Sequence, residues 1–115
     1  MLKVIITRRA DMTAVVFDGH ASAGNYGSDI VCASASMLAY TLAEAVKKRG
    51  ARGMFTCEPI VALSPGSARI VFAPQREYVD ELGVIVDVIA DGYRMLAASY
   101  PDNVQFIYDA TPERA

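Results

Sequence analysis

The chain has 115 residues, of which 53% are hydrophobic and 21% charged, and its formal net charge at pH 7 is −2. This composition excludes an intrinsically disordered chain. The small negative charge argues against general affinity for nucleic acids, so no direct nucleic-acid binding is expected. The length predicts a single domain over residues 1–115.

The sequence shows no targeting segment. The apolar run after Lys3 is too short for a signal peptide, and no run is long enough to span a bilayer. We therefore expect a cytoplasmic protein without membrane contact, in which Cys32 and Cys57 are reduced thiols. Two cysteines and one histidine without zinc-ligand spacing predict no metal, and no cofactor is expected.

Strand and helix patterns follow one another without a linker or an internal repeat. Runs rich in β-branched residues predict strands, and apolar residues at helical spacing predict helices. The predicted elements are strands over residues 2–7 and 13–17, a loop over 18–28, a helix over 29–49, a strand within 53–63, a turn over 64–67, a strand over 68–72, a helix over 75–100 and a strand over 104–108. The order ββαββαβ predicts an α+β fold, with a mostly antiparallel β-sheet packed with two helices.

Each predicted helix has an apolar face. In the first helix this face consists of Val31, Ala35, Leu38, Leu42 and Ala45. Ser28 or Asp29 suits its N-cap, and Gly50 is expected to end it. The face of the second helix consists of Val79, Leu82, Val86, Ile89, Tyr93 and Leu96.

The second helix carries a further apolar row beside this face, formed by Val84, Ile85 and Val88. A helix that is apolar on more than one side is buried on more than one side. Either the row forms the interface of a homodimer, or the sheet wraps the helix within one subunit.

His20 and Cys32 are candidates for nucleophilic catalysis. Cys32 lies three residues after Asp29, where the positive end of the helix dipole favours a thiolate and backbone N–H groups could bind an oxyanion. The intervening loop is long enough to bring His20 within hydrogen-bond reach of the sulfur, as a base. Alternatively, Cys32 is an ordinary core residue and His20 an ordinary loop residue.

A longer pattern surrounds this pair. It consists of Gly19-His20-Ala21, Tyr26-Gly27-Ser28-Asp29-Ile30-Val31-Cys32-Ala33 and Ser36. It resembles the signature of the ribosomal-processing cysteine protease family Prp, including the spacing from histidine to cysteine. The chain departs from that signature at Ser22 and Ala23, in the loop. It also departs at Ser34 and Ala35, which follow the cysteine, and the Cys-His dyad is intact.

The resemblance implies that Cys32 is the nucleophile and His20 the general base and acid, with no third residue assigned. It also implies that Asp29 and Ser36 shape the site, although Asp29 also suits a helix cap and Ser36 a bond within its own helix. The flexible loop that admits a peptide would include Ser22, Gly24, Tyr26 and Gly27. Candidates to line a peptide pocket are Tyr26, Met37 and Tyr40.

The function that the resemblance implies is a cysteine endopeptidase that removes the N-terminal extension of a bacterial large-subunit ribosomal protein. Two other classes stay open. One is a non-catalytic, ribosome-associated peptide-binding module in which Cys32 is inert. The other is a different thiol enzyme, and a redox role would require Cys57 as the resolving cysteine. Cys57 falls in a predicted strand and is otherwise expected to be structural.

Overall fold

The structure is a computed structural model that describes residues 1–19 and 29–110. Its elements are, in chain order, β1 (Leu2–Arg8), β2 (Thr13–Asp18), α1 (Ile30–Ala51), β3 (Ile60–Ser64), β4 (Ser67–Phe72), the 3₁₀ helix η1 (Arg76–Tyr78), α2 (Val79–Ser99) and β5 (Val104–Ala110). The predicted ββαββαβ order and α+β fold are confirmed. The start of the second predicted helix is the short 3₁₀ turn η1.

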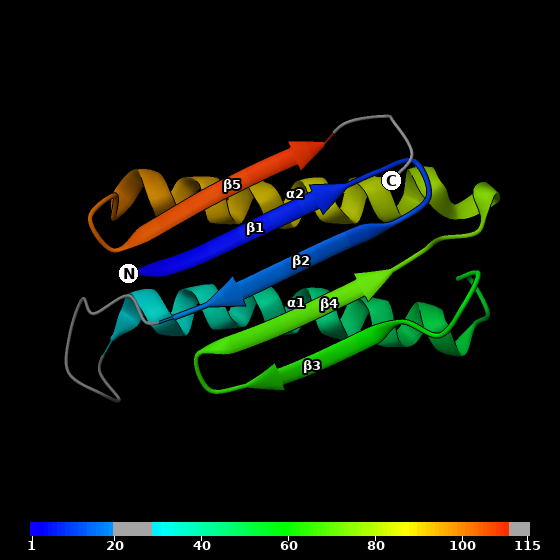
Figure 1. Ribbon diagram of the computed structural model, residues 1–115, viewed down its shortest axis with the longest axis horizontal. Coiled ribbons are helices and arrows are strands. Elements are labelled where there is room, and N and C mark those ends of the chain that lie inside the picture. The colour runs from blue at the N-terminus through cyan, green and yellow to red at the C-terminus, as the bar shows by residue number, and fades with distance from the viewer. Residues whose placement is uncertain (20–28, 111–115) are drawn as a thin grey trace.

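The strands form one five-stranded sheet in the order β3-β4-β2-β1-β5. Neighbouring strands are antiparallel except β1 and β5, which run parallel. Helices α1 and α2 lie side by side on one face of this sheet and run in opposite directions (Figure 1). The start of α1 therefore lies at the end of the sheet where β2 and β3 finish (Figure 1).

The core lies between the sheet and the two helices. Alternate residues of the central strands face the helices and are buried, beginning with Leu2, Val4 and Ile6 of β1. The buried residues of α1 are Val31, Ala35, Ala39, Leu42, Ala43 and Val46. Those of α2 are Leu82, Gly83, Val86, Ile89, Ala90 and Tyr93. Both helices thus bury the faces that their spacing predicts, although Leu38, Ala45, Val79 and Leu96 are only half-buried.

Helix α1 continues through Gly50, so the prediction that this glycine ends the helix is wrong. A Cβ atom on Gly50 would lie 3.4 Å from Cγ of Pro59, which is an ordinary packing distance to a neighbouring segment. The helix is instead capped by Arg52, whose N–H group bonds two carbonyls of the last turn. A residue with a left-handed backbone conformation commonly follows a helix, and here that residue is Gly53, at φ 72°.

The strand predicted within residues 53–63 is also shorter than expected. Only Ile60–Ser64 is a strand, so the placement of Cys57 in a strand is wrong, and its side chain is exposed. The preceding segment is held by the buried side chains of Met54 and Phe55 and by backbone hydrogen bonds to the residues that follow β4. The Phe55 ring is buried with its centroid 5.5 Å from that of Phe72.

The further apolar row of α2 faces solvent. Val84 and Val88 are 63% and 62% exposed, and Ile85 is half-buried. The sheet therefore does not wrap these two valines within one subunit.

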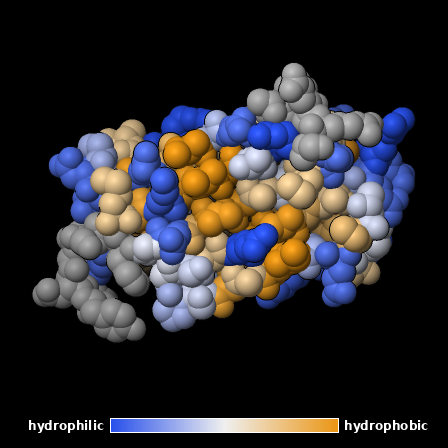
Figure 2. Space-filling view, in the orientation of Figure 1, coloured by the Kyte–Doolittle hydropathy of each residue, from blue (hydrophilic) through white to orange (hydrophobic). Residues whose placement is uncertain are grey.

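The face of the sheet opposite the helices also carries exposed hydrophobic side chains. Val16, Ile60 and Ile107 are exposed, and Ile5 between them is half-buried. Figure 2 shows hydrophobic side chains gathered across the strands on this face, with polar side chains around them. An exposed apolar area of this kind often marks a surface that contacts another molecule.

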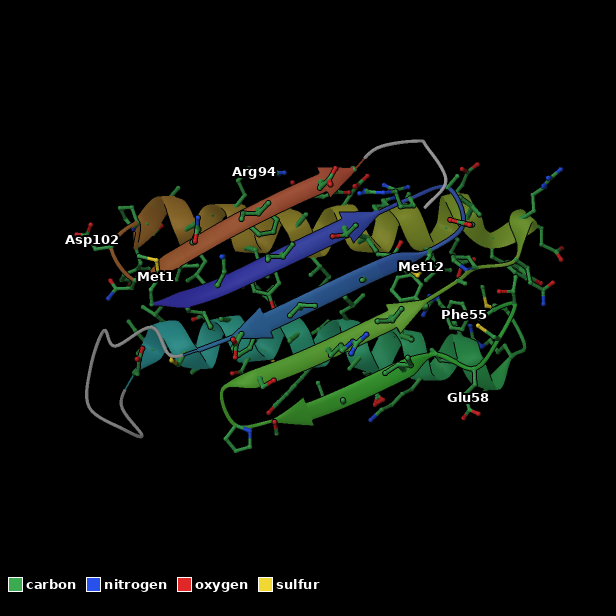
Figure 3. All side chains as sticks on the ribbon, in the orientation of Figure 1. Met1, Met12, Phe55, Glu58, Arg94 and Asp102 are labelled. Carbon is green, nitrogen blue, oxygen red and sulfur yellow. The ribbon has the colours of Figure 1, made fainter. Side chains whose placement is uncertain are left out.

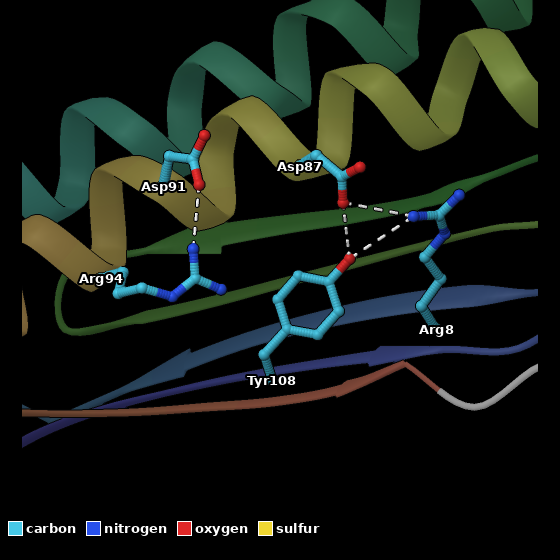
Figure 4. A network of polar contacts seen from close by, with 5 residues as sticks. All are labelled: Arg8, Asp87, Asp91, Arg94 and Tyr108. Carbon is cyan, nitrogen blue, oxygen red and sulfur yellow. Dashed lines mark hydrogen bonds and ion pairs between the residues drawn. The ribbon is translucent and has the colours of Figure 1, made fainter.

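A polar network joins the far ends of β1 and β5 to α2 (Figure 4). The Tyr108 hydroxyl donates to Oδ1 of Asp87 at 2.9 Å, and the Arg8 guanidinium lies 3.3 Å from the same oxygen. Burial is the main cause that raises the pKa of Tyr108. Because Asp87 is exposed, the ion pair is expected to add less than about 1 kcal/mol to the stability.

By length and composition alone, α1 is apolar enough to cross a membrane. This differs from the expectation drawn from the sequence. The structure accounts for the composition, because one face of α1 packs on the sheet as a core helix.

A buried hydrogen bond ties α2 to the first half of α1. The Tyr93 hydroxyl donates to the Ala35 carbonyl at 2.9 Å, and burial raises the pKa of Tyr93 above its usual range, so the group stays a neutral donor. We expect Tyr93→Phe to lower the free energy of unfolding by about 1 kcal/mol. Tyr108→Phe, which removes an exposed bond, should cost less than half as much. Denaturant unfolding of both variants tests this, and equal effects would contradict it.

Candidate active site

The first turn of α1 is capped by Asp29. Its backbone is extended, and its Oδ1 atom accepts the N–H groups of Val31 and Cys32, both at 3.0 Å. Its carbonyl accepts the N–H of Ala33 at 3.1 Å. The prediction of an N-cap at Asp29 is confirmed, and the cap bonds the backbone of the candidate nucleophile itself.

This cap changes the expectation for an oxyanion hole. The N–H groups of Val31, Cys32 and Ala33 already have acceptors on Asp29. They are therefore not available to a substrate oxyanion unless the cap opens.

We expect Asp29→Ala to lower the free energy of unfolding by about 1 kcal/mol, because two helix N–H groups lose their acceptor. Asp29→Asn keeps an oxygen acceptor and should restore most of that loss. Thermal unfolding of both variants measures the difference. If the two variants were equally destabilised, charge and not capping would explain the role of Asp29.

Cys32 is half-buried and its side chain packs against the hydrophobic core. It is not joined to Cys57. Cys57 shares a pocket with Lys47, near the other end of α1, and Lys47 is about 22 Å along the helix from Cys32 at 1.5 Å per residue. A disulfide requires Cα atoms within about 7 Å. Cys57 is therefore too distant to act as a resolving cysteine, which argues against the redox hypothesis.

Ser36 lies one helical turn after Cys32 and is half-buried. The bond to a carbonyl four residues earlier is made by Ser34 and Thr41, each at 2.7 Å. Within residues 1–19 and 29–110, Ser36 makes no such bond. Its hydroxyl is therefore not committed to its own helix there, which leaves the predicted site-shaping role open.

The candidate base lies outside the described residues, as do the predicted loop residues Ser22, Gly24, Tyr26 and Gly27. The roles of His20 and of these four residues therefore stay predictions. The structure does describe Gly19, the residue before His20. Gly19 has φ 98°, and its N–H donates to the Gly66 carbonyl at 2.9 Å.

Gly19 fixes the point at which the chain leaves the sheet toward His20. A Cβ atom there would lie 2.6 Å from the backbone oxygen of Met1. Both the positive φ angle and this contact require glycine. Gly19 is not among the predicted site residues, although a glycine between a strand and the only histidine of the chain is a usable signal.

One of the candidate pocket residues lies away from Cys32. Met37 and Tyr40 are exposed. Met37 lines a groove between α1 and α2 together with Leu38 and Met95. Helical spacing places Cys32 on the opposite flank of α1, so the structure does not bring Met37 and the nucleophile together.

The first turn of α1, which holds Cys32, is at the end of the sheet where β2 finishes, and the sequence continues from β2 through Gly19 to the only histidine (Figure 1). A thiol at a helix start that is paired with a histidine is typical of a cysteine-dependent hydrolase. Comparison with known proteins gives the same class. The family model described as "Cysteine protease Prp" matches residues 1–105. The chain belongs to this family of cysteine proteases.

Solved structures of relatives have the same fold. The ribosomal processing protease Prp from S. aureus, in complex with a covalently linked product peptide, is 26% identical and has a TM-score of 0.70, over 95% of this chain and 100% of that chain. The structure of the same S. aureus protein in complex with a substrate peptide is 25% identical and has a TM-score of 0.65, again over 95% of this chain and 100% of that chain. SMU.848 from Streptococcus mutans, at 23% identity, a TM-score of 0.68 and 96% coverage of both chains, supports the fold alone. Among curated proteins no match is found.

Proposed function

We propose that this protease is cytoplasmic and removes the N-terminal extension of a large-subunit ribosomal protein, with Cys32 as nucleophile and His20 as base. The observation that carries the proposal is the half-buried thiol of Cys32 at the capped start of α1, within the segment that matches the Prp family. The S. aureus relative, a ribosomal processing protease, supports the choice of substrate.

The proposed reaction has two steps. In the first, His20 takes the proton from the Cys32 thiol, and the sulfur attacks the carbonyl carbon of the scissile peptide bond. The carbon–nitrogen bond breaks, His20 returns the proton to the leaving amine, and the N-terminal fragment remains on Cys32 as a thioester. In the second step, His20 takes a proton from water. The resulting hydroxide attacks the carbonyl carbon of the thioester, the carbon–sulfur bond breaks, and the fragment leaves as a carboxylic acid. His20 returns the proton to the Cys32 sulfur, which restores the free enzyme.

The test is a cleavage assay on a peptide that copies the N-terminal extension of the ribosomal protein of the same organism. Wild type should cut one bond, and Cys32→Ala and His20→Ala should not. Tight binding of the peptide without cleavage by wild type would instead support the non-catalytic peptide-binding module. If wild type neither cleaves nor binds the peptide, both functions are refuted.

The proposal includes a homodimer. Val84 and Val88 of α2 are exposed and supply an apolar row on the outside of the helical layer. Val84→Glu with Val88→Glu should convert a dimer to a monomer in light scattering. A dimer that survives this change would point to the apolar open face of the sheet, and a monomeric wild type would refute the dimer.

A further inference from the structure

Strand β3 is an edge of the sheet that lacks the usual protection. None of its residues is charged, and Ile60 and Leu63 are 50% and 36% exposed. Proteins usually protect edge strands with charge, proline or a bulge, because the unpaired backbone can accept another strand. The opposite edge, β5, carries Asp109, which pairs with Arg9 at 3.0 Å. Strand β3 is thus the edge better suited to receive an extended peptide.

The hairpin predicts which backbone groups of β3 are open. Pro65 and Gly66 form a two-residue turn, with Gly66 at φ 73°, and Ser64 pairs with Ser67 across it. In an antiparallel pair, residues alternate between those bonded to the partner strand and those whose N–H and C=O groups point outward. Counting from the turn, the outward-pointing residues are Val61 and Leu63. They offer bonding groups along the free edge.

The same side of the molecule carries Cys32. Cys32, Ser36, Ala43, Lys47 and Gly50 share one flank of α1 by their helical spacing. Lys47 and Gly50 line a pocket together with Val61 of β3, so the flank faces β3 at this end of the helix. The nucleophile lies at one end of the flank and the pocket at the other.

This pocket has a volume of about 660 Å³ and an apolar wall formed by Phe55, Pro59 and Val61. Its other lining residues include Lys47 and Glu58. Phe55 and Glu58 lie near the end of α1 that is opposite to the Cys32 end (Figure 3). A pocket with an apolar wall and a few polar groups has room for an apolar side chain of a peptide together with part of its backbone.

The distances match an extended peptide. Lys47 follows Cys32 by 15 residues, about 22 Å along the helix. A strand advances about 3.3 Å per residue, so about seven residues would span this distance. The thioester chemistry retains the fragment on the N-terminal side of the cut, so this fragment is the one that benefits from a long binding surface.

We infer, resting on the proposed function, that the segment before the scissile bond binds as an added strand along β3. An apolar side chain about seven residues before the cut enters the pocket of Phe55, Pro59 and Val61. Because β3 runs from the pocket toward the end of α1 that holds Cys32, the peptide lies parallel to β3 (Figure 1). Added strands gain affinity from backbone bonds and specificity from such pockets.

Kinetics with peptides of different length test the inference. Peptides with eight residues before the cut should have a KM about tenfold lower than peptides with four. Ala51→Trp, which fills the pocket, should remove this advantage and leave kcat and the shorter peptide unaffected. Met37→Trp, on the opposite flank of α1, is the matched control and should keep the advantage. A KM that does not depend on length, or an equal loss in both variants, would overturn the inference.

A second readout does not depend on catalysis. In Cys32→Ala the exposed Cys57, which lines the pocket, is the sole remaining cysteine. The eight-residue peptide should slow alkylation of Cys57 by iodoacetamide several-fold, and the four-residue peptide should not. Protection without cleavage in wild type would support this binding site and refute the proposed protease function. Cleavage by wild type without protection would support the protease and refute the site.

Discussion

Replacing Cys32 by alanine is expected to lower kcat/KM for the extension peptide by about 10⁴-fold or more. The reason is that the thioester cannot form without the sulfur, and losses of this size follow removal of a nucleophile in related mechanisms. The fold should persist, because Cys32 is only half-buried and the cap at Asp29 bonds its backbone and not its side chain. Product formation by mass spectrometry measures the loss, and thermal unfolding checks the fold.

Ser34→Ala is the matched control for this variant. Ser34 lies in the same helical turn as Cys32, is exposed, and bonds the Ile30 carbonyl of its own helix. It should keep activity within about twofold of wild type, since changes at exposed positions are usually small. Residual cleavage above about one tenth of wild type in Cys32→Ala would show that Cys32 is not the nucleophile.

Gly19→Ala is expected to have the largest effect on stability, about 2–3 kcal/mol. Two costs combine, because alanine is strained at φ 98° and its Cβ would lie 2.6 Å from the Met1 backbone oxygen. Since Gly19 directly precedes His20, activity should fall further than the unfolded fraction explains. Denaturant unfolding and kcat/KM on the same preparation measure the two effects.

Gly53→Ala separates these two costs. Gly53 also has a positive φ of 72°, but no heavy atom lies within 4 Å of the position of its Cβ. This variant should therefore show only the backbone cost, about 1 kcal/mol, and retain normal activity. Equal destabilisation by both variants would mean that the contact with Met1 is relieved at no cost.

The sequence predicts the fold well where burial follows a simple period. The apolar face of α1 that includes Val31, Ala35 and Leu42 is buried as predicted, because it packs on the buried face of a sheet whose strands alternate between buried and exposed residues. Gly50 misled the prediction of the helix end, because the helix continues to Ala51 and the glycine with a positive φ angle is Gly53. Two glycines close together leave the exact helix end open to local rules.

The candidate site was predictable only in part. Asp29 and Cys32 are three residues apart on one helix, so local rules fix their geometry and predict the cap. Only the structure shows that the cap also accepts the backbone N–H of Cys32. The structure is also needed to place Cys57 at the end of α1 opposite to Cys32, because the position of Cys57 depends on how the chain returns after the helix.

The central claim is that Cys32 forms a thioester with the N-terminal fragment of the substrate. The most direct measurement is the intact mass of the protein after mixing with the extension peptide and quenching in acid. We predict a wild-type species heavier by the mass of the released fragment minus one water, located on Cys32 by peptide mapping, and no such species in Cys32→Ala. Cleavage of the peptide with no adduct, or an adduct in Cys32→Ala, would contradict the claim.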